Sequence, residues 1–173
     1  MFLNHLKDFT AKKIVKNNLA GAALLPSENK IRSIGLLVDE SYFGLRVQLV
    51  AALQRKGLSG ATVEVLAFRD KVKKSESFEY PVFSHADITW AATISRPQIR
   101  KFIDQPFDLL INYYDTEKAA LLLVSHLSKA SFKVGFASVD KRLNHFMIDT
   151  TAENYDVFAT ELIRYLKILN KLS

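Results

Sequence analysis

The chain contains no cysteine among its 173 residues. This absence excludes disulfide bonds, iron–sulfur clusters, thiolate zinc sites and cysteine nucleophiles, and with them redox functions based on thiols. Long apolar runs are absent as well, because the longest, such as residues 119–124, fall far short of the roughly 18 residues of a membrane-spanning helix. The lysine-rich start has no continuous apolar stretch of the kind that a secretory signal needs. We therefore expect a soluble, cytoplasmic protein without a transmembrane segment.

Glycine is scarce, and none of the six glycines stands in a phosphate-binding pattern. A nucleotide site in a strand-to-helix turn needs glycines, because larger side chains keep phosphates away from backbone N–H groups. The first such turn reads VDESYFG over residues 38–44, and its two carboxylates would repel a pyrophosphate. There is no G-x-S-x-G elbow for a serine nucleophile, and the four histidines lack metal-ligand spacing. The sequence predicts no cofactor and no metal.

Residues 107–136 contain the clearest structural pattern in the chain. An apolar strand at residues 109–113 is followed by a polar turn, an apolar helix at 116–127 and a second apolar strand at 132–136. Strands that are apolar on both faces must be covered by helices on both sides, which is typical of a parallel sheet. The chain is long enough for one core. We therefore predict an α/β fold, a single Rossmann-like three-layer domain with a mainly parallel sheet.

Other segments extend this pattern. Residues 31–38, 61–68 and 146–148 are further predicted strands, whereas in the charged stretch at 69–90 a short edge strand stays open but is not assigned. Polar residues that can cap helices precede three helical segments: Asp39 or Ser41 for the second helix, Ser95 before Pro97 for the third, and Thr150 with Glu153 for the C-terminal helix.

Residues 1–25 are predicted to form a basic helical arm, and residues 30–173 the Rossmann-like domain, with a helix-breaking linker between them. The apolar residues of the arm that share one face are Phe2, Leu3, Leu6 and Phe9. Beyond Thr10 this face does not continue. Two interpretations stay open: the helix packs its first turns on the domain, or it is an arm that contacts an anionic partner. Peripheral membrane contact has less support because the apolar face is short.

The ends of the strands are the predicted location of a ligand. In an open parallel sheet, ligands bind outside the carboxyl ends of the strands, where the strand order reverses. For an order of 3-2-1-4-5, this crevice lies between the strands at residues 31–38 and 109–113. Its candidate lining residues follow these strands: Asp39, Glu40, Ser41, Tyr42, Tyr113, Tyr114, Asp115 and Thr116.

The carboxylates of the crevice allow more than one role. Asp39, Glu40 and Asp115 can hold Mg²⁺ or act as general acid and base. Carboxylates near helix N-termini are also stabilised by capping and by the helix dipole, by about 0.3–1 kcal/mol each, and this structural role is the one we expect. Of Tyr113 and Tyr114, at most one can stack on a ligand ring, because adjacent strand residues point to opposite faces.

The charge of the chain favours an anionic partner. Its formal net charge is +6 and its pI about 9.5, which favours RNA, the ribosome or an acidic membrane surface over neutral partners. The basic residues that we predict to contact such a partner lie in the arm and after the second strand: Lys12, Lys13, Lys16, Arg69, Lys71, Lys73 and Lys74.

Three segments carry a resemblance to known families: IRSIGLLVDESYF, FDLLINYYDTEKAALLLVSHLSKASFKVGF and RLNHFMIDT. Over nearly its whole length the chain resembles a family of small bacterial single-domain proteins of unknown function. More distantly, FDLLIN with LSKASFKVGF is similar to the N-terminal Rossmann-like half of heptosyltransferase-type glycosyltransferases. That family has a glycine beside its catalytic aspartate, whereas Asp39 here is followed by Glu40, and it has a second domain for the sugar nucleotide. This resemblance implies at most a degenerate glycosyltransferase-like domain.

Two functional hypotheses follow. The first is a non-catalytic α/β binding or adaptor protein whose basic surface contacts RNA or the ribosome. The second is a small-ligand binder or enzyme that uses the acidic strand-end crevice. Basic residues gathered on one face would favour the first, and a deep pocket in which Asp39 and Asp115 face each other would favour the second.

Overall fold

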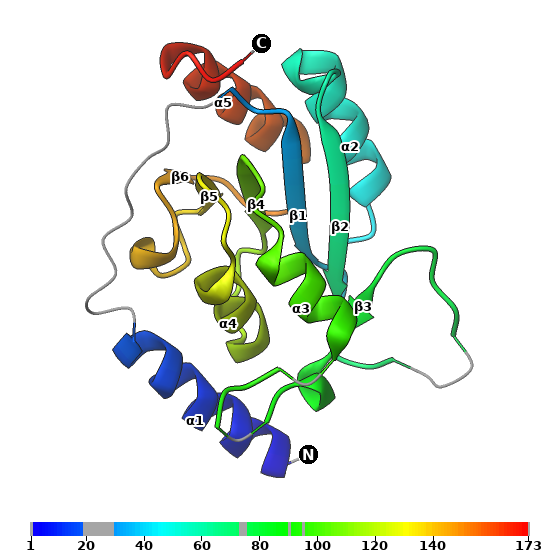
Figure 1. Cartoon of the computed structure of the whole chain (residues 1–173), viewed down its shortest axis with the longest axis vertical. Helices are drawn as coiled ribbons and strands as arrows, with labels where there is room; N and C mark the ends of the chain where they lie inside the picture. Colours follow the sequence, from blue (N-terminus) through cyan, green and yellow to red (C-terminus); the bar gives the residue numbers. More distant parts are fainter. Residues whose placement is uncertain (1, 19–29, 73–75, 90, 95, 173) are drawn as a thin grey trace.

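A computed structural model describes residues 2–18, 30–72, 76–89, 91–94 and 96–172 of the chain. Within these residues, six strands form one sheet in the order β3-β2-β1-β4-β5-β6, and each neighbouring pair is parallel (Figure 1). The strands are β1 (Ser33–Asp39), β2 (Thr62–Phe68), β3 (Val82–Phe83), β4 (Leu109–Tyr113), β5 (Lys133–Phe136) and β6 (Phe146–Ile148). The predicted Rossmann-like α/β fold with a parallel sheet is confirmed.

Helices cover both faces of this sheet. The α-helices of the described residues are α1 (Phe2–Asn18), α2 (Arg46–Leu53), α3 (Pro97–Asp104), α4 (Ala119–Leu127) and α5 (Tyr155–Ile168). α2 continues into the short π-helical turn η2 (Gln54–Leu58). α2 contacts α5 and α3 contacts α4, so each pair forms one outer layer, and α1 packs against α4 (Figure 1).

β1 and β4 are the central strands. They pair with each other, and β1 also pairs with β2 while β4 pairs with β5. All of β4 and every residue of β1 after Ser33 are buried, as the apolar pattern predicts. A Cβ at Gly35 would lie 2.6 Å from the ring of Phe107, so only glycine lets this ring lie against the sheet. The predicted central position of both strands is confirmed.

α2 begins later than the sequence predicts. The predicted cap is Asp39 or Ser41, but the N-cap residue is Leu45, and its side chain makes no capping hydrogen bond. Asp39 Oδ1 accepts a hydrogen bond from Ser41 N at 2.9 Å, and Ser41 Oγ accepts one from Asp70 N at 2.9 Å. The capping prediction is therefore wrong, because both side chains bond within the loop that precedes the helix and to the end of β2.

α5 also lacks its predicted cap. Its N-cap residue is Asn154, so the predicted capping box of Thr150 and Glu153 is wrong. The hydroxyl of Tyr113 donates a hydrogen bond to Ala152 O at 2.7 Å. This bond holds the segment before α5 on the end of β4, and the helix begins only after it.

The edge strand β3 lies in the charged stretch to which the sequence pattern assigns no strand. Its pairing includes the hydrogen bond from Arg69 N to Phe83 O at 2.9 Å. A two-residue strand has no periodicity of its own, so only the pairing with β2 defines it. The predicted cap of α3, Ser95, lies outside the described residues, and the N-cap residue Arg96 makes no side-chain capping bond.

α1 packs on the domain through its second half. Ala11 and Val15 are almost fully buried, while Phe9 is 67% exposed. The side chains of Phe2, Leu3 and Leu6 lie outside the description, as do residues 19–25 of the predicted arm and the linker. At helical spacing Ala11 and Val15 lie on another side of α1 than Phe9, so the end of the predicted apolar face at Thr10 stays a prediction. Among the described residues, none of the helices combines the length and the apolar character that a bilayer crossing needs.

The outer layer formed by α5 can be tested by a core substitution. Leu162 is fully buried, so Leu162→Ala should lower the free energy of unfolding by about 2–5 kcal/mol. Chemical denaturation monitored by circular dichroism measures this change. The control Val157→Ala, at an exposed site of the same helix, should change it by less than about 0.5 kcal/mol. Equal stability of both variants would show that α5 is not part of the core.

Candidate functional site

A small cavity lies at the carboxyl ends of β1 and β4, where the strand order reverses. Its volume is about 100 Å³, and its lining includes six of the eight predicted crevice residues: Asp39, Tyr42, Tyr113, Tyr114, Asp115 and Thr116. Binding sites for small molecules are typically about 300–1,000 Å³. The structure therefore brings these residues together around a space that holds only a few water molecules.

Tyr113 and Tyr114 are not available for stacking. Both side chains are fully buried. The Tyr113 hydroxyl donates to Ala152 O, and the Tyr114 hydroxyl lies 2.6 Å from Ser125 Oγ. Burial raises the pKa of both phenols above its ordinary value. They are core residues whose polar ends are satisfied within the protein.

Asp39 is neutralised by Lys118, a residue that the sequence analysis does not identify. Lys118 Nζ lies 2.7 Å from Asp39 and 2.9 Å from Asp70, and it donates to Ser41 Oγ at 3.1 Å. Burial by itself would raise the pKa of Asp70, but the hydrogen bond from Lys118 lowers it below its ordinary value. This cluster joins the ends of β1 and β2 to the start of α4.

Glu40 forms a second ion cluster on the neighbouring side of the loop. Its side chain is 7% exposed and lies 2.8 Å from Arg46 Nε and 2.9 Å from Arg69 Nη2. The Tyr80 hydroxyl donates to it at 2.9 Å. Arg69, predicted to contact an anionic partner, is thus held by a carboxylate of the same chain.

These contacts limit the chemistry of the crevice. A general acid or base must direct its carboxylate at a substrate, but Asp115 Oδ2 accepts a hydrogen bond from Ala152 N at 2.9 Å, and Asp39 is paired with Lys118. Both aspartates line the small cavity, yet in each of them a carboxylate oxygen is bonded to a partner within the protein. The arrangement favours a structural role for these side chains.

The Glu40 cluster makes a testable contribution to stability. Glu40→Gln keeps the shape but removes the charge that two guanidinium groups share, and it should lower the free energy of unfolding by about 1–3 kcal/mol. Urea denaturation at pH 7 measures the loss. Glu161→Gln is the matched control, since Glu161 pairs only with the exposed Arg164, at 3.2 Å, and it should cost less than about 0.5 kcal/mol. Equal effects would contradict a stabilising role for the cluster.

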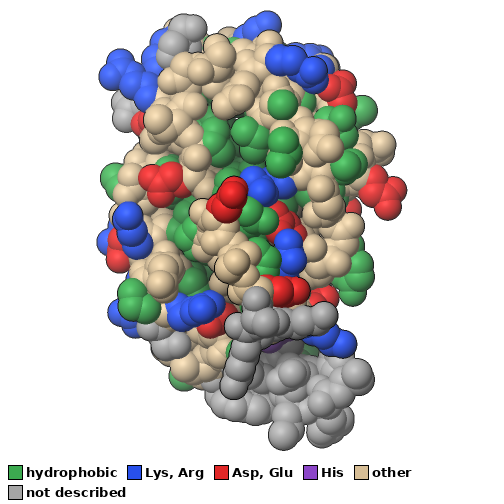
Figure 2. Space-filling model, turned by 90° about the vertical axis from the view of Figure 1, so that its right-hand side faces the viewer, with side chains coloured by type: hydrophobic (Ala, Val, Ile, Leu, Met, Phe, Trp, Pro, Cys, Tyr) green, Lys and Arg blue, Asp and Glu red, His purple; other side chains and the backbone are tan. Residues whose placement is uncertain are grey.

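Two of the predicted anion-contact residues in α1 are held in ion pairs within the protein. Lys12 and Lys16 pair with Glu117, at 3.6 and 2.7 Å. Lys13 and Lys71 are exposed, and no ion pair involves them among the described residues; Lys73 and Lys74 lie outside that part of the chain. On the face shown in Figure 2, Lys and Arg side chains lie among Asp and Glu side chains and form no continuous basic patch.

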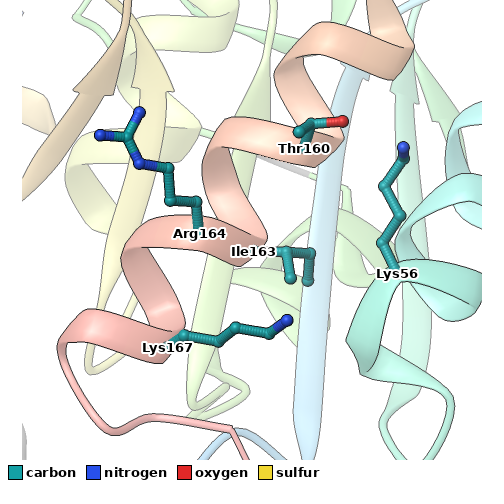
Figure 3. Close-up of a pocket in the computed structure, with 5 residues that line it drawn as sticks. All are labelled: Lys56, Thr160, Ile163, Arg164 and Lys167. Atoms are coloured by element: carbon teal, nitrogen blue, oxygen red, sulfur yellow. The ribbon is translucent and has the colours of Figure 1, made fainter.

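Basic side chains do gather beside α5, at a place that the sequence analysis misses. A groove of about 510 Å³ separates α5 from η2, and its lining residues, called the basic groove below, are Lys56, Thr160, Ile163, Arg164 and Lys167 (Figure 3). Lys56 and Lys167 extend on either side of Ile163, while Arg164 extends from the other side of α5. Thr160, Ile163 and Lys167 recur at helical spacing, a signal that the sequence contains.

Lys133 is a buried cation at the start of β5. Its side chain is 5% exposed, and Nζ donates to Ser125 O at 2.7 Å. Burial lowers the pKa of Lys133 from 10.5 to about 8. Burial, together with the nearby charge of Lys133, also lowers the pKa of His126.

Lys133 should make stability depend on pH. The unfolded chain binds more protons than the folded one between about pH 8 and 10.5, so the free energy of unfolding should rise with pH across this window, by about 3 kcal/mol at most. Lys133→Met should remove this rise and increase stability at pH 7. Thermal melts from pH 7 to 10.5 measure it, with the exposed Lys101→Met as control. A rise that survives Lys133→Met would assign it to another group.

The comparisons with known proteins are consistent with one of the two resemblances. A family model described as a family of unknown function (DUF6913) matches residues 7–169. No curated protein matches the chain. The resemblance to heptosyltransferases is therefore not supported by any homologue.

Proposed function

Because the chain belongs to DUF6913, a family of unknown function, we propose its function from its own residues: it is a non-catalytic binding or adaptor protein with an anionic partner. One contrast carries this proposal. Asp39 and Glu40 at the strand ends form ion pairs whose side chains are mostly buried, whereas the ion pairs of the basic groove are more exposed and surround a cavity five times as large. The cations of the basic groove are therefore more accessible to a partner than these carboxylates.

The charge state of the groove supports this function. Lys56 pairs with Asp156 at 3.1 Å and Arg164 with Glu161 at 3.2 Å, and both pairs are at least partly exposed. Exposed ion pairs are worth about 0–1 kcal/mol, so a partner's acidic groups can replace them at little cost. Lys167 is exposed and has no ion pair among the described residues. An anionic partner would therefore gain contacts without breaking the core.

Taken alone, the net charge of the chain favours RNA or the ribosome as the partner. That either of them binds at the basic groove is our proposal. A small ligand in the strand-end crevice, or a degenerate glycosyltransferase-like activity, has less support, because the cavity there is small and its carboxylates are paired. The proposed function thus places the partner on the outer surface and not at the strand ends.

A charge-matched pair of variants tests the groove. Lys56→Gln/Arg164→Gln/Lys167→Gln removes three groove cations, and Lys101→Gln/Lys129→Gln/Lys141→Gln removes three elsewhere, so both variants have the same net charge. Fluorescence anisotropy with labelled poly(U) and labelled poly-glutamate, at several salt concentrations, measures binding. For whichever polyanion binds, the groove variant should weaken binding by about tenfold or more, and the control by less than about threefold.

The salt dependence gives a second readout. If the groove contacts RNA phosphates, the groove variant should also reduce the slope of log affinity against log salt by about two. Equal loss in both triple variants would show that only net charge matters. No binding of either polyanion would contradict the proposed function.

A further inference from the structure

The outer face of α5 has an exposed apolar residue at each end and the ion pair of Arg164 with Glu161 between them. Val157 is 51% exposed and Ile168 67% exposed, although both are large apolar side chains. They stand eleven residues apart, about three helical turns, on the same side of the helix, and the rise of an α-helix places them about 16 Å apart. Arg164 lies between them in the sequence and on the same side. Arg164 also lines the basic groove, so this face and the groove share one residue.

The basic groove also combines an apolar residue with cations. Ile163 lies between Lys56 and Lys167 in Figure 3, so an apolar side chain is flanked by two cations from different elements. The aliphatic parts of the lysine side chains add apolar surface beside their charges. Gly57, with φ of 152°, brings η2 close to Ile163, because a Cβ there would lie 3.4 Å from Ile163 Cγ2. Ile163 itself is only 4% exposed, so the apolar surface that a partner would meet here comes mainly from the aliphatic parts of the lysine side chains.

We infer that this face of α5, with the basic groove, docks an acidic amphipathic helix of a partner protein. The inference rests on the proposed function, since it names the class of anionic partner. A helix of about three turns reaches both Val157 and Ile168. Its apolar stripe would cover these two residues, and its glutamates or aspartates would pair with Lys167 and replace Asp156 and Glu161 as partners of Lys56 and Arg164. Charge complementarity and the exposed apolar pair both point to this occupant.

The apolar residues separate this partner from RNA. A phosphate chain gains nothing from Val157 or Ile168, and grooves for single-stranded nucleic acid use aromatic side chains on which bases stack. None of the residues that line the basic groove is aromatic. A protein helix, by contrast, gains from burying each exposed methyl group.

The test uses a substitution that leaves all charges in place. Val157→Ser/Ile168→Ser removes the exposed apolar pair, and Val47→Ser/Leu127→Ser is the control, because these two residues are also exposed and belong to other helices. The probe is a labelled peptide of about 18 residues with leucines on one helical face and glutamates beside them. A scrambled peptide of equal composition and labelled poly(U) are the comparison probes.

Binding of each probe to the full chain is measured by fluorescence anisotropy. The amphipathic peptide should bind about tenfold tighter than its scrambled form, and Val157→Ser/Ile168→Ser should abolish most of that difference. The control variant should keep it, and unchanged melting temperatures would show that both variants fold.

The other outcomes overturn the inference in distinguishable ways. Equal binding of both peptides would show that the groove recognises charge alone, and the inference fails while the proposed function stands. Binding of poly(U) that depends on the groove cations, with no peptide preference, would assign the surface to RNA. Absence of binding by every probe would reject the inference and the proposed function together.

Discussion

Because β1 and β4 carry apolar side chains on both faces, the sheet is stable only when a helical layer covers each side. One layer contains α2 and α5, and the other contains α3 and α4. α4 must in turn be covered on the side that faces away from the sheet, since its residues from Ala119 to Ser125 are all buried. α1 covers that side with Ala11 and Val15, so burial of α4 depends on a helix at the start of the chain.

This layered core leaves little freedom at the carboxyl ends of the strands. In open α/β folds that edge is the usual place for ligands, but here Lys118 joins Asp39 to Asp70, and Glu40 holds two arginines. These clusters tie together loops that follow three different strands. The residues at the edge where such folds usually bind ligands are therefore engaged in contacts that hold the fold together. Fold alone would have suggested the opposite.

The sequence predicts the parts of this structure that depend on local patterns. The central strands and α5 follow from apolar runs and helical spacing, and the position of the crevice follows from strand order. Lys118 is not predictable in this way, because its partner Asp39 lies far away in the sequence and only the fold brings them together. β3 and the packing of Val15 depend on long-range contacts too. The sequence contains a signal for only one side of the basic groove, in the spacing of Thr160 and Lys167. The other side, Lys56, comes from η2.

The contact of α1 with α4 also constrains the order in which the chain can fold. Lys12 Nζ donates to the backbone oxygen of Glu117 at 2.9 Å, across a sequence separation of 105 residues. During synthesis α1 is made first, but the surface on which Ala11 and Val15 pack is made only after β1, β2 and β4. α1 therefore cannot reach its native place before α4 has been made, although α1 itself is made first.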